Sequence, residues 1–329
     1  MQRLLPLLAA LLSLALLASA TPAAAKEAPA YVAIGDSLTF GVGASDPATG
    51  GYAAITYDAL RKSERYRDRG LDLINLGVPG ATSADLLLPG GQLEQALNEI
   101  IERREDTSSS DDNVEIITVG IGGNDVLALA TPDSPCVADP LASECQILFE
   151  EMLTALEENL TQLLRGLREA VPKAKIVVLD LYSPLSGRGD AAELIVDFAI
   201  RGINDLTQSV VSQTKLSADL ASVYPLFRGR AAQLVADDQI HPNDEGHALM
   251  GEVVLATIEG REPVLPEDLI TPTTVEGISN APLGQGGLQP LAPDDDDGSN
   301  LALLLAIAIP AALLGAAAVA GVYLTARGR

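Results

Sequence analysis

Short apolar runs and amphipathic stretches alternate through the middle of the chain. Runs rich in β-branched residues, such as 114–119, predict buried strands, whereas leucines at helical spacing in 146–170 predict a helix with one core-facing side. The predicted strands are 32–34, 71–76, 114–119, 175–181 and 221–224, and the predicted helices are 52–60, 92–103, 146–170, 190–215 and 244–258. This alternation implies right-handed crossovers and an α/β fold, in which a parallel five-stranded sheet is covered on both faces.

The N-terminal end breaks this alternation. Residues 4–18 are apolar, follow Arg3 and lead into small residues, which is the three-part pattern of a secretory signal peptide. Cleavage after Ala20 or after Ala25 suits the small-residue rule equally well, so its position stays open. An uncharged stretch at 4–25 would also suit an uncleaved anchor, but the two small-residue exits favour a signal peptide at 1–25.

A second apolar block at the C-terminal end, 301–324, is uncharged and has the length of a transmembrane helix. Acidic residues precede it and two arginines follow it, so the positive-inside rule predicts a short cytoplasmic tail at 325–329. Residues 262–300 are rich in proline, glycine and acidic residues, which predicts a linker. We therefore expect a domain at 26–261 held outside the cytoplasm by a single-pass anchor in the cell membrane. A removable lipid-anchor signal fits the terminal charges less well.

The charge balance excludes one class of partner. The chain has 45 acidic and 21 basic residues, a net charge of -24, whereas binding of nucleic acid requires basic patches. Its two cysteines, Cys136 and Cys145, lie close together, and in an exported protein such a pair predicts one disulfide that closes a small loop. No histidine neighbours them, so we expect no zinc site.

Ser37 is a candidate nucleophile, because it follows the first predicted strand and ligands bind at the carboxyl ends of strands in open α/β sheets. A serine needs a general base, and of the two histidines His241 follows the last strand whereas His247 falls within the last helix. Asp238 lies three residues before His241, so one turn can bring its carboxylate to the imidazole; Asp237 is an alternative in poorer register.

An oxyanion hole also has candidates, namely the backbone N–H groups of Ser37 and Gly80 and the carboxamide of Asn124. Each of these residues has a structural alternative. Ser37 can cap the following helix, Gly80 and Gly77 can serve only their turn, and asparagine is common in turns such as the one at Asn124. Asn159 opens an Asn-Leu-Thr acceptor sequence for glycosylation within a predicted helix.

Four segments in this order resemble the SGNH, or GDSL, family of serine esterases and lipases. They are GDSL at 35–38, NLGVPG at 75–80, GGND at 122–125 and DQIHP at 238–242, and the match spans about 30–260. The resemblance implies a flavodoxin-like three-layer α/β/α sandwich, ester hydrolysis through an acyl-enzyme, and Gly80 rather than Gly77 as oxyanion donor. It also implies that no metal or cofactor is needed. No G-x-S-x-G elbow surrounds Ser37, so the α/β-hydrolase fold is not supported.

The predicted function is therefore that of a membrane-anchored, extracytoplasmic serine esterase acting on acyl esters of lipids or small molecules. A carbohydrate O-acetyl esterase is the alternative enzyme, although aromatic residues make up 3% of the chain and tryptophan is absent, which disfavours an extended sugar-stacking surface. A surface binding module that no longer turns over is the alternative from another class. It is disfavoured because Ser37, Asp238 and His241 are all present.

Overall fold

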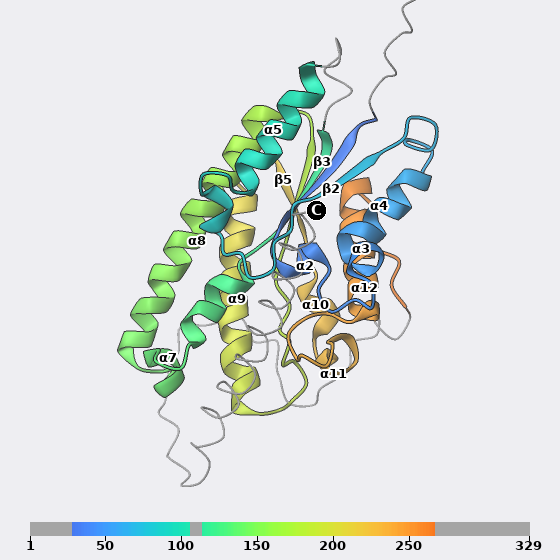
Figure 1. Cartoon of the computed structure of the whole chain (residues 1–329). Coiled ribbons are helices and arrows are strands. Elements are labelled where there is room, and N and C mark those ends of the chain that lie inside the picture. The colour runs from blue at the N-terminus through green and yellow to red at the C-terminus, as the bar shows by residue number, and fades with distance from the viewer. Residues whose placement is uncertain (1–27, 106–113, 267–329) are drawn as a thin grey trace, which may run out of the picture.

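The computed structural model describes residues 28–105 and 114–266 (Figure 1). The predicted signal peptide at 1–25, the transmembrane segment at 301–324, the tail at 325–329 and most of the linker lie outside these residues. Within the described ranges, no helix combines the length and the apolar character that crossing a membrane requires.

A single parallel sheet forms the centre of the domain, with strand order β2-β1-β3-β4-β5. The strands are β1 (Ala30–Gly35), β2 (Asp72–Asn75), β3 (Val114–Gly120), β4 (Lys175–Leu179) and β5 (Ala218–Ala221). After β2 the chain returns to the other side of β1 and then builds outward, so the strand order reverses at β1 and β3. In doubly wound sheets, that switch point at the carboxyl edge is where ligands bind.

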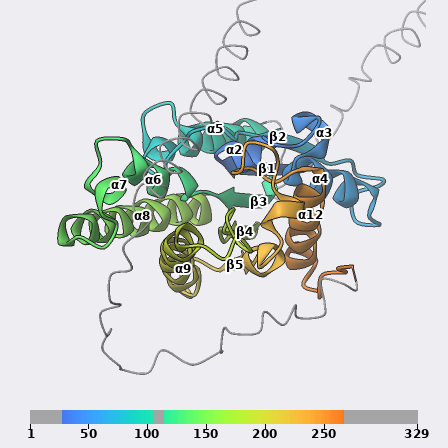
Figure 2. The same cartoon turned by 90° about the horizontal axis from the view of Figure 1, so that it is seen from below.

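Helices cover both faces of the sheet, which makes three layers (Figure 2). One face packs against α5 (Gln92–Glu105), α8 (Ser143–Ala170) and α9 (Ala191–Val211), and the other against α4 (Tyr52–Lys62) and α12 (Asp244–Glu259). Alternate residues of each strand serve the two layers, because successive side chains in a strand point to opposite faces. The predicted α/β fold with a five-stranded parallel sheet is thus confirmed.

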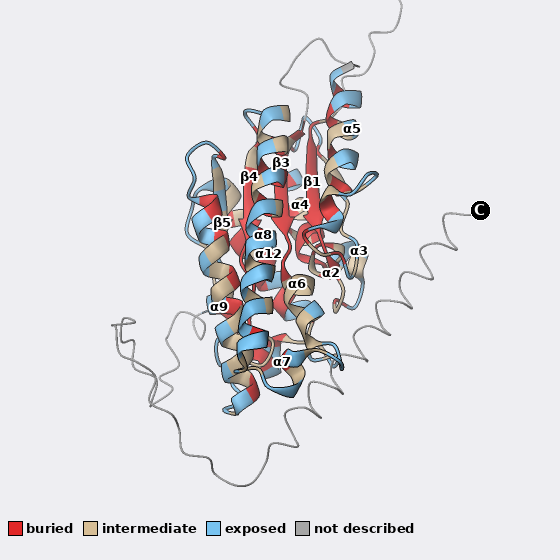
Figure 3. Cartoon of the chain, turned by 90° about the vertical axis from the view of Figure 1, so that its left-hand side faces the viewer, coloured by how far each residue is buried: buried red, intermediate tan, exposed pale blue. Residues whose placement is uncertain are grey.

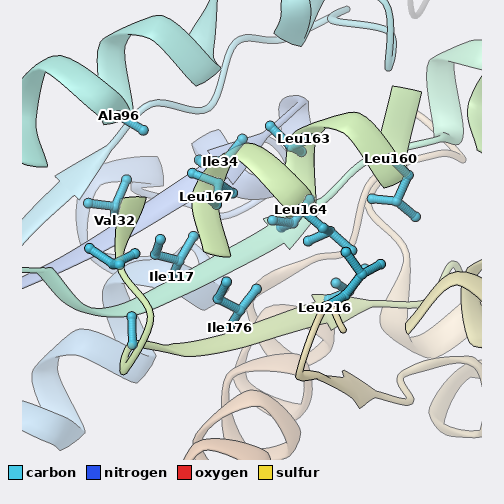
Figure 4. Close-up of a cluster of buried hydrophobic side chains, with 14 of the residues drawn as sticks. Val32, Ile34, Ala96, Ile117, Leu160, Leu163, Leu164, Leu167, Ile176 and Leu216 are labelled. Atoms are coloured by element: carbon cyan, nitrogen blue, oxygen red, sulfur yellow. The ribbon is translucent and has the colours of Figure 1, made fainter. Parts of the chain in front are cut away.

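The larger core lies between the sheet and α8. Leu164 and Leu167 of α8 are fully buried against Ile34, Ile117 and Ile176 of three neighbouring strands (Figure 4). Figure 3 shows the central strands β1, β3 and β4 largely buried, whereas the outward side of α8 is exposed. A strand buried on both faces can be apolar at every position, which explains the continuous apolar runs in the sequence. Each such side chain contributes about 1.5–3 kcal/mol by leaving water.

Short helices occupy connections that the sequence pattern did not predict as helical. They are α2 (Ser37–Phe40), α3 (Pro47–Gly50), α6 (Gly123–Leu127), α7 (Pro135–Ala138), α10 (Tyr224–Phe227) and α11 (Ala231–Leu234), with the 3-10 turns η1 (Asp85–Leu87) and η2 (Ala128–Ala130). Each is too short to show helical periodicity in the sequence. The predicted disulfide between Cys136 and Cys145 is present and links α7 to the first turn of α8.

The fifth strand was predicted wrongly at 221–224. It spans Ala218–Ala221, and the chain then turns into α10. The cause is the buried carboxylate of Asp180, just beyond β4, which accepts hydrogen bonds from the backbone N–H groups of Val223 (2.6 Å) and Tyr224 (2.9 Å). These donors are therefore used by a side chain and not by a continued strand ladder.

Candidate active site

Ser37 is the first residue of α2, immediately beyond the carboxyl end of β1 (Figure 1). The helix cap is the preceding residue, since the Asp36 carboxylate accepts a hydrogen bond from the Leu38 backbone N–H (2.9 Å). The capping role considered for Asp36 or Ser37 thus belongs to Asp36. The Ser37 hydroxyl bonds to another part of the chain.

Gly35 makes the abrupt turn before Ser37 possible. Its backbone φ of +151° is rare for residues that carry a side chain, and a Cβ there would lie 2.1 Å from the Gly120 carbonyl oxygen. Its backbone is also held from outside the sheet by the buried side chain of Gln92, the first residue of α5. Sequence reasoning missed Gln92, because nothing in its local pattern distinguishes it from an ordinary helix residue.

Ser37, His241 and Asp238 form one continuous hydrogen-bonded chain. The Ser37 Oγ and His241 Nε2 are 2.8 Å apart, and the His241 Nδ1 and Asp238 Oδ2 are 2.6 Å apart. Gln239 lies between the aspartate and the histidine at a φ of +61°, which is rare for a residue other than glycine. This tight turn brings the Asp238 carboxylate back onto the imidazole, while Asp237 is exposed.

The Asp238 carboxylate is strongly favoured in its ionised form. Partial burial raises its pKa, but hydrogen bonds from the His241 side chain and from the backbone N–H groups of His241 and Ile240 outweigh burial and lower the pKa to about 2. An ionised carboxylate accepts a hydrogen bond from the Nδ1–H of His241. The Nε2 then carries a lone pair directed at the Ser37 hydroxyl.

The proposed oxyanion donors lie on the three connections that follow β1, β2 and β3, at the same edge of the sheet. Among the described residues, no oxygen accepts a hydrogen bond from the backbone N–H of Ser37 or of Gly80. The Asn124 carboxamide donates one hydrogen bond to the Ala81 carbonyl oxygen (2.9 Å) and has a second N–H to offer. Three donors therefore remain available at this edge.

Gly77 differs from Gly80 in both backbone contacts and packing. The Gly77 N–H donates to the Asn75 side chain (2.9 Å), and a Cβ at Gly77 would lie 2.5 Å from the Phe40 backbone nitrogen. Gly80 has a φ of +86° and open space where a Cβ would be. Gly77 thus allows close approach to α2, and Gly80 has the free N–H.

A second carboxyl group, that of Asp36, is buried beside Ser37. Burial raises its pKa to about 7, and the nearby Asp125 charge acts in the same direction, against the lowering effects of the hydrogen bond from Leu38 and the charge of His241. This group therefore titrates near neutral pH, which the sequence did not indicate.

His247 is fully buried under the loop that supports His241. Its Nε2 donates to the Val42 carbonyl oxygen (2.9 Å), and its Nδ1 accepts from the Tyr52 backbone N–H (3.2 Å). The next loop residue, Gly43, lies so close to the His241 turn that a Cβ would be 2.2 Å from the Pro242 carbonyl oxygen. His247 is thus part of the last helix, as predicted, and also a structural support for the site.

The chain is similar to known proteins over most of its described residues. The GDSL-like lipase/acylhydrolase family model matches residues 33–249. The chain is 24% identical over 241 residues to the uncharacterized protein YpmR of Bacillus subtilis (71% of this chain, 83% of that protein). It is 26% identical over 237 residues to the spore germination lipase LipC of Bacillus licheniformis (70% and 97%). The crystal structure of the lipase Lip_vut3 from a goat rumen metagenome has the same fold, with a TM-score of 0.53, 22% identity and coverage of 70% and 97%.

Proposed function

The chain belongs to the GDSL-like lipase/acylhydrolase family of ester hydrolases, and from this premise we propose that Ser37, His241 and Asp238 hydrolyse acyl esters through a covalent acyl-enzyme. The observation that carries the proposal is the hydrogen-bonded chain from the Ser37 hydroxyl through the His241 imidazole to the Asp238 carboxylate. A serine hydroxyl is a weak nucleophile by itself, so its contact with a base is the feature that the chemistry requires.

In the first half of the reaction, the Ser37 Oγ attacks the ester carbonyl carbon while its proton passes to the His241 Nε2. Asp238 stabilises the resulting imidazolium and keeps the ring in the productive orientation. The tetrahedral intermediate collapses, the C–O bond to the alcohol breaks, and His241 returns the proton to the departing alcohol. Water then repeats the sequence on the acyl-enzyme, which releases the carboxylic acid and restores Ser37.

A negative charge develops on the carbonyl oxygen in the transition state. We propose that the backbone N–H groups of Ser37 and Gly80 and the carboxamide of Asn124 stabilise it by hydrogen bonds. All three are neutral donors, which suits a charge that appears only in the transition state. Loss of one such donor typically reduces kcat by ~10²–10³-fold. The free N–H groups of Ser37 and Gly80 support this assignment.

The surface next to the proposed nucleophile is apolar, which favours a substrate with a hydrocarbon acyl chain over a polar substrate. Leu38 follows Ser37, Val126 lies two residues after Asn124, and both are partly exposed while packing against a cluster of buried apolar side chains. The cluster consists of Leu156, Leu181, Ile200 and Ile203. An acyl chain that lies against such a surface leaves water, which stabilises its binding. This supports lipid or small-molecule acyl esters as substrates, with an O-acetylated carbohydrate as the alternative.

We also propose that the domain works outside the cytoplasm, anchored in the membrane by 301–324. The disulfide Cys136–Cys145 supports this location, because disulfides persist in oxidising compartments. Protease treatment of intact cells should remove the domain from full-length protein, and a variant ending at residue 300 should appear in the medium. Protection of the domain in intact cells would contradict the proposed location.

The activity is tested with p-nitrophenyl esters of increasing chain length, using full-length protein in detergent. The wild-type protein should hydrolyse them and the Ser37→Ala variant should not. A rate that rises from acetate to longer chains would support lipid-like substrates, and a strict preference for acetate would support the carbohydrate alternative. Absence of turnover, together with no labelling of Ser37 by a fluorophosphonate, would contradict the proposed function.

A further inference from the structure

Two of the proposed oxyanion donors follow strands that are not neighbours in the sheet. Gly80 follows β2 and Asn124 follows β3, and β1 lies between these two strands in the sheet. The sheet therefore does not by itself fix the distance between the Gly80 N–H and the Asn124 carboxamide. Contacts between the loops must do so.

Asp125 provides the most extensive of these contacts. Its carboxylate accepts hydrogen bonds from the Ser83 hydroxyl (2.6 Å) and from the Ser83 backbone N–H (3.0 and 3.2 Å to its two oxygens). Ser83 lies three residues after Gly80, and Asp125 is adjacent to Asn124. The two donors thus sit beside the two ends of one charge-assisted link, of the kind that is about twice as strong as a neutral hydrogen bond.

Ser83 is itself fixed on its other side. It is 2% exposed, and its Oγ accepts a hydrogen bond from the Asn159 side chain of α8 (3.0 Å). The hydroxyl hydrogen is therefore free to point at Asp125. Because Asn159 belongs to the long core helix, the link holds the Gly80 loop to α6 and also to the body of the domain. The glycosylation acceptor noted in the sequence thus has a structural contact.

We propose that Asp125 is a positioning residue that sets the geometry of the oxyanion hole by tying the Gly80 loop to Asn124. This inference rests on the proposed function, because it takes Gly80 and Asn124 as the donors. Stabilisation of an oxyanion is expressed only in the transition state, so a misplaced donor lowers kcat and leaves KM nearly unchanged. A substitution at Asp125 should show this pattern although the side chain does not reach the substrate.

The neighbouring pair Thr82 and Asp85 offers a matched control, because Thr82 directly precedes Ser83. Asp85 accepts hydrogen bonds from the backbone N–H (2.8 Å) and the hydroxyl (2.7 Å) of Thr82, the same pair of contacts that Asp125 makes with Ser83. Asp85 and Thr82 lie on the same connection, however, and their contact does not join it to α6. Comparing the two variants thus distinguishes the effect of a contact between two connections from that of the same kind of contact within one connection.

The experiment measures kcat and KM for an activated ester with the full-length Asp125→Asn and Asp85→Asn variants. We expect kcat of Asp125→Asn to fall by about tenfold to a hundredfold with KM changed by less than about threefold, since donor misplacement acts on the transition state. The Asp85→Asn variant should keep kcat within about twofold, since surface changes have small effects. In an Asn124→Ala background, Asp125→Asn should have a much smaller effect, because residues that act through one group are not additive.

Thermal denaturation of each variant keeps the test interpretable. If Asp125→Asn fails to fold, Ser83→Ala replaces it, since this variant retains the backbone contact and loses the hydroxyl; a lowered kcat is again expected. An unchanged kcat in a folded variant, or a full additional loss in the Asn124→Ala background, would overturn the role of Asp125 alone. Absence of hydrolysis by the wild-type protein would overturn the proposed function and this inference with it.

Discussion

The side-chain amide of Gln92 pairs with both backbone groups of Gly35, two residues before the proposed nucleophile. Its Oε1 accepts from the Gly35 N–H (2.7 Å) and its Nε2 donates to the Gly35 carbonyl oxygen (2.8 Å). A side chain from α5 thus completes the hydrogen bonding of β1 at the point where β2 has ended. The position of Ser37 depends on this contact as well as on the sheet.

The Gln92→Ala substitution should therefore lower both stability and activity. The Gly35 carbonyl keeps a hydrogen bond from the Val78 N–H, but the buried Gly35 N–H loses its partner, which typically costs about 1–3 kcal/mol. Denaturant titration and ester hydrolysis measure the two effects. The control is Gln95→Ala on the exposed side of α5, where an amide contact with the Gly90 carbonyl oxygen is lost. Equal effects of the two substitutions would contradict the role given to Gln92.

The Asp238→Asn substitution should lower kcat by about 10⁴-fold and leave the fold intact. An amide at this position can donate a hydrogen bond to the His241 Nδ1, which favours the tautomer with a proton on Nε2. That nitrogen then cannot accept the Ser37 proton. The matched control is Asp237→Asn at the exposed neighbouring carboxylate, which should retain activity. A greater loss of kcat in the Asp237 variant than in the Asp238 variant would reverse the assignment.

The disulfide should contribute locally and not to the integrity of the domain. It joins α7 to the start of α8 with a separation of 9 residues, while the core leucines of α8 lie further along that helix. Closure of so short a loop stabilises by about 3 kcal/mol or less. A Cys136→Ser/Cys145→Ser variant should remain folded and active, with faster hydrogen exchange confined to about 128–146. Global unfolding of that variant, detected by circular dichroism, would contradict a purely local role of the disulfide.

The central sheet and the order of its loops could be predicted from the sequence, since buried parallel strands are continuous apolar runs and each ends in a recognisable loop. The end of the edge strand β5 could not be predicted, because it depends on the Asp180 carboxylate. This carboxylate also accepts a hydrogen bond from the Ser222 hydroxyl, 42 residues further along the chain. A contact over that distance leaves no local pattern in the sequence.

The residues proposed to act directly could be found by their type and spacing, but their supports could not. Ser37 and His241 are 204 positions apart, yet each stands in a short characteristic segment. Gln92 and Ser83 are ordinary residues within a helix and a loop, and their contacts with Gly35 and Asp125 arise only when the chain is folded. The pKa of Asp36 likewise depends on burial, which its neighbours in the sequence do not determine.

The buried Asp36 carboxyl should make the domain less stable as pH rises toward neutrality. Its pKa is raised to about 7 in the folded protein, whereas in an unfolded chain it is about 3.9. Between these values the folded state retains a proton that the unfolded state releases, so the free energy of unfolding falls as pH rises from about 4 to about 7. The stabilising contribution is complete below about pH 4 and is lost above the folded pKa.

An Asp36→Asn variant isolates this contribution, because asparagine is also a good helix cap and has no proton to lose. Burial lowers the pKa of His247, which gives the opposite slope below its ordinary pKa of about 6.5, so the decisive quantity is the difference between wild type and variant. Denaturant unfolding at pH 5 and pH 8 should show a larger loss of stability in the wild-type protein than in Asp36→Asn.

Asp46 caps α3 by the same contact, with the Ala48 N–H, but is exposed, so Asp46→Asn should behave as the wild type does. Parallel pH dependence in the wild type and Asp36→Asn would mean that Asp36 is ionised at the lower pH as well, contrary to its burial beside Ser37.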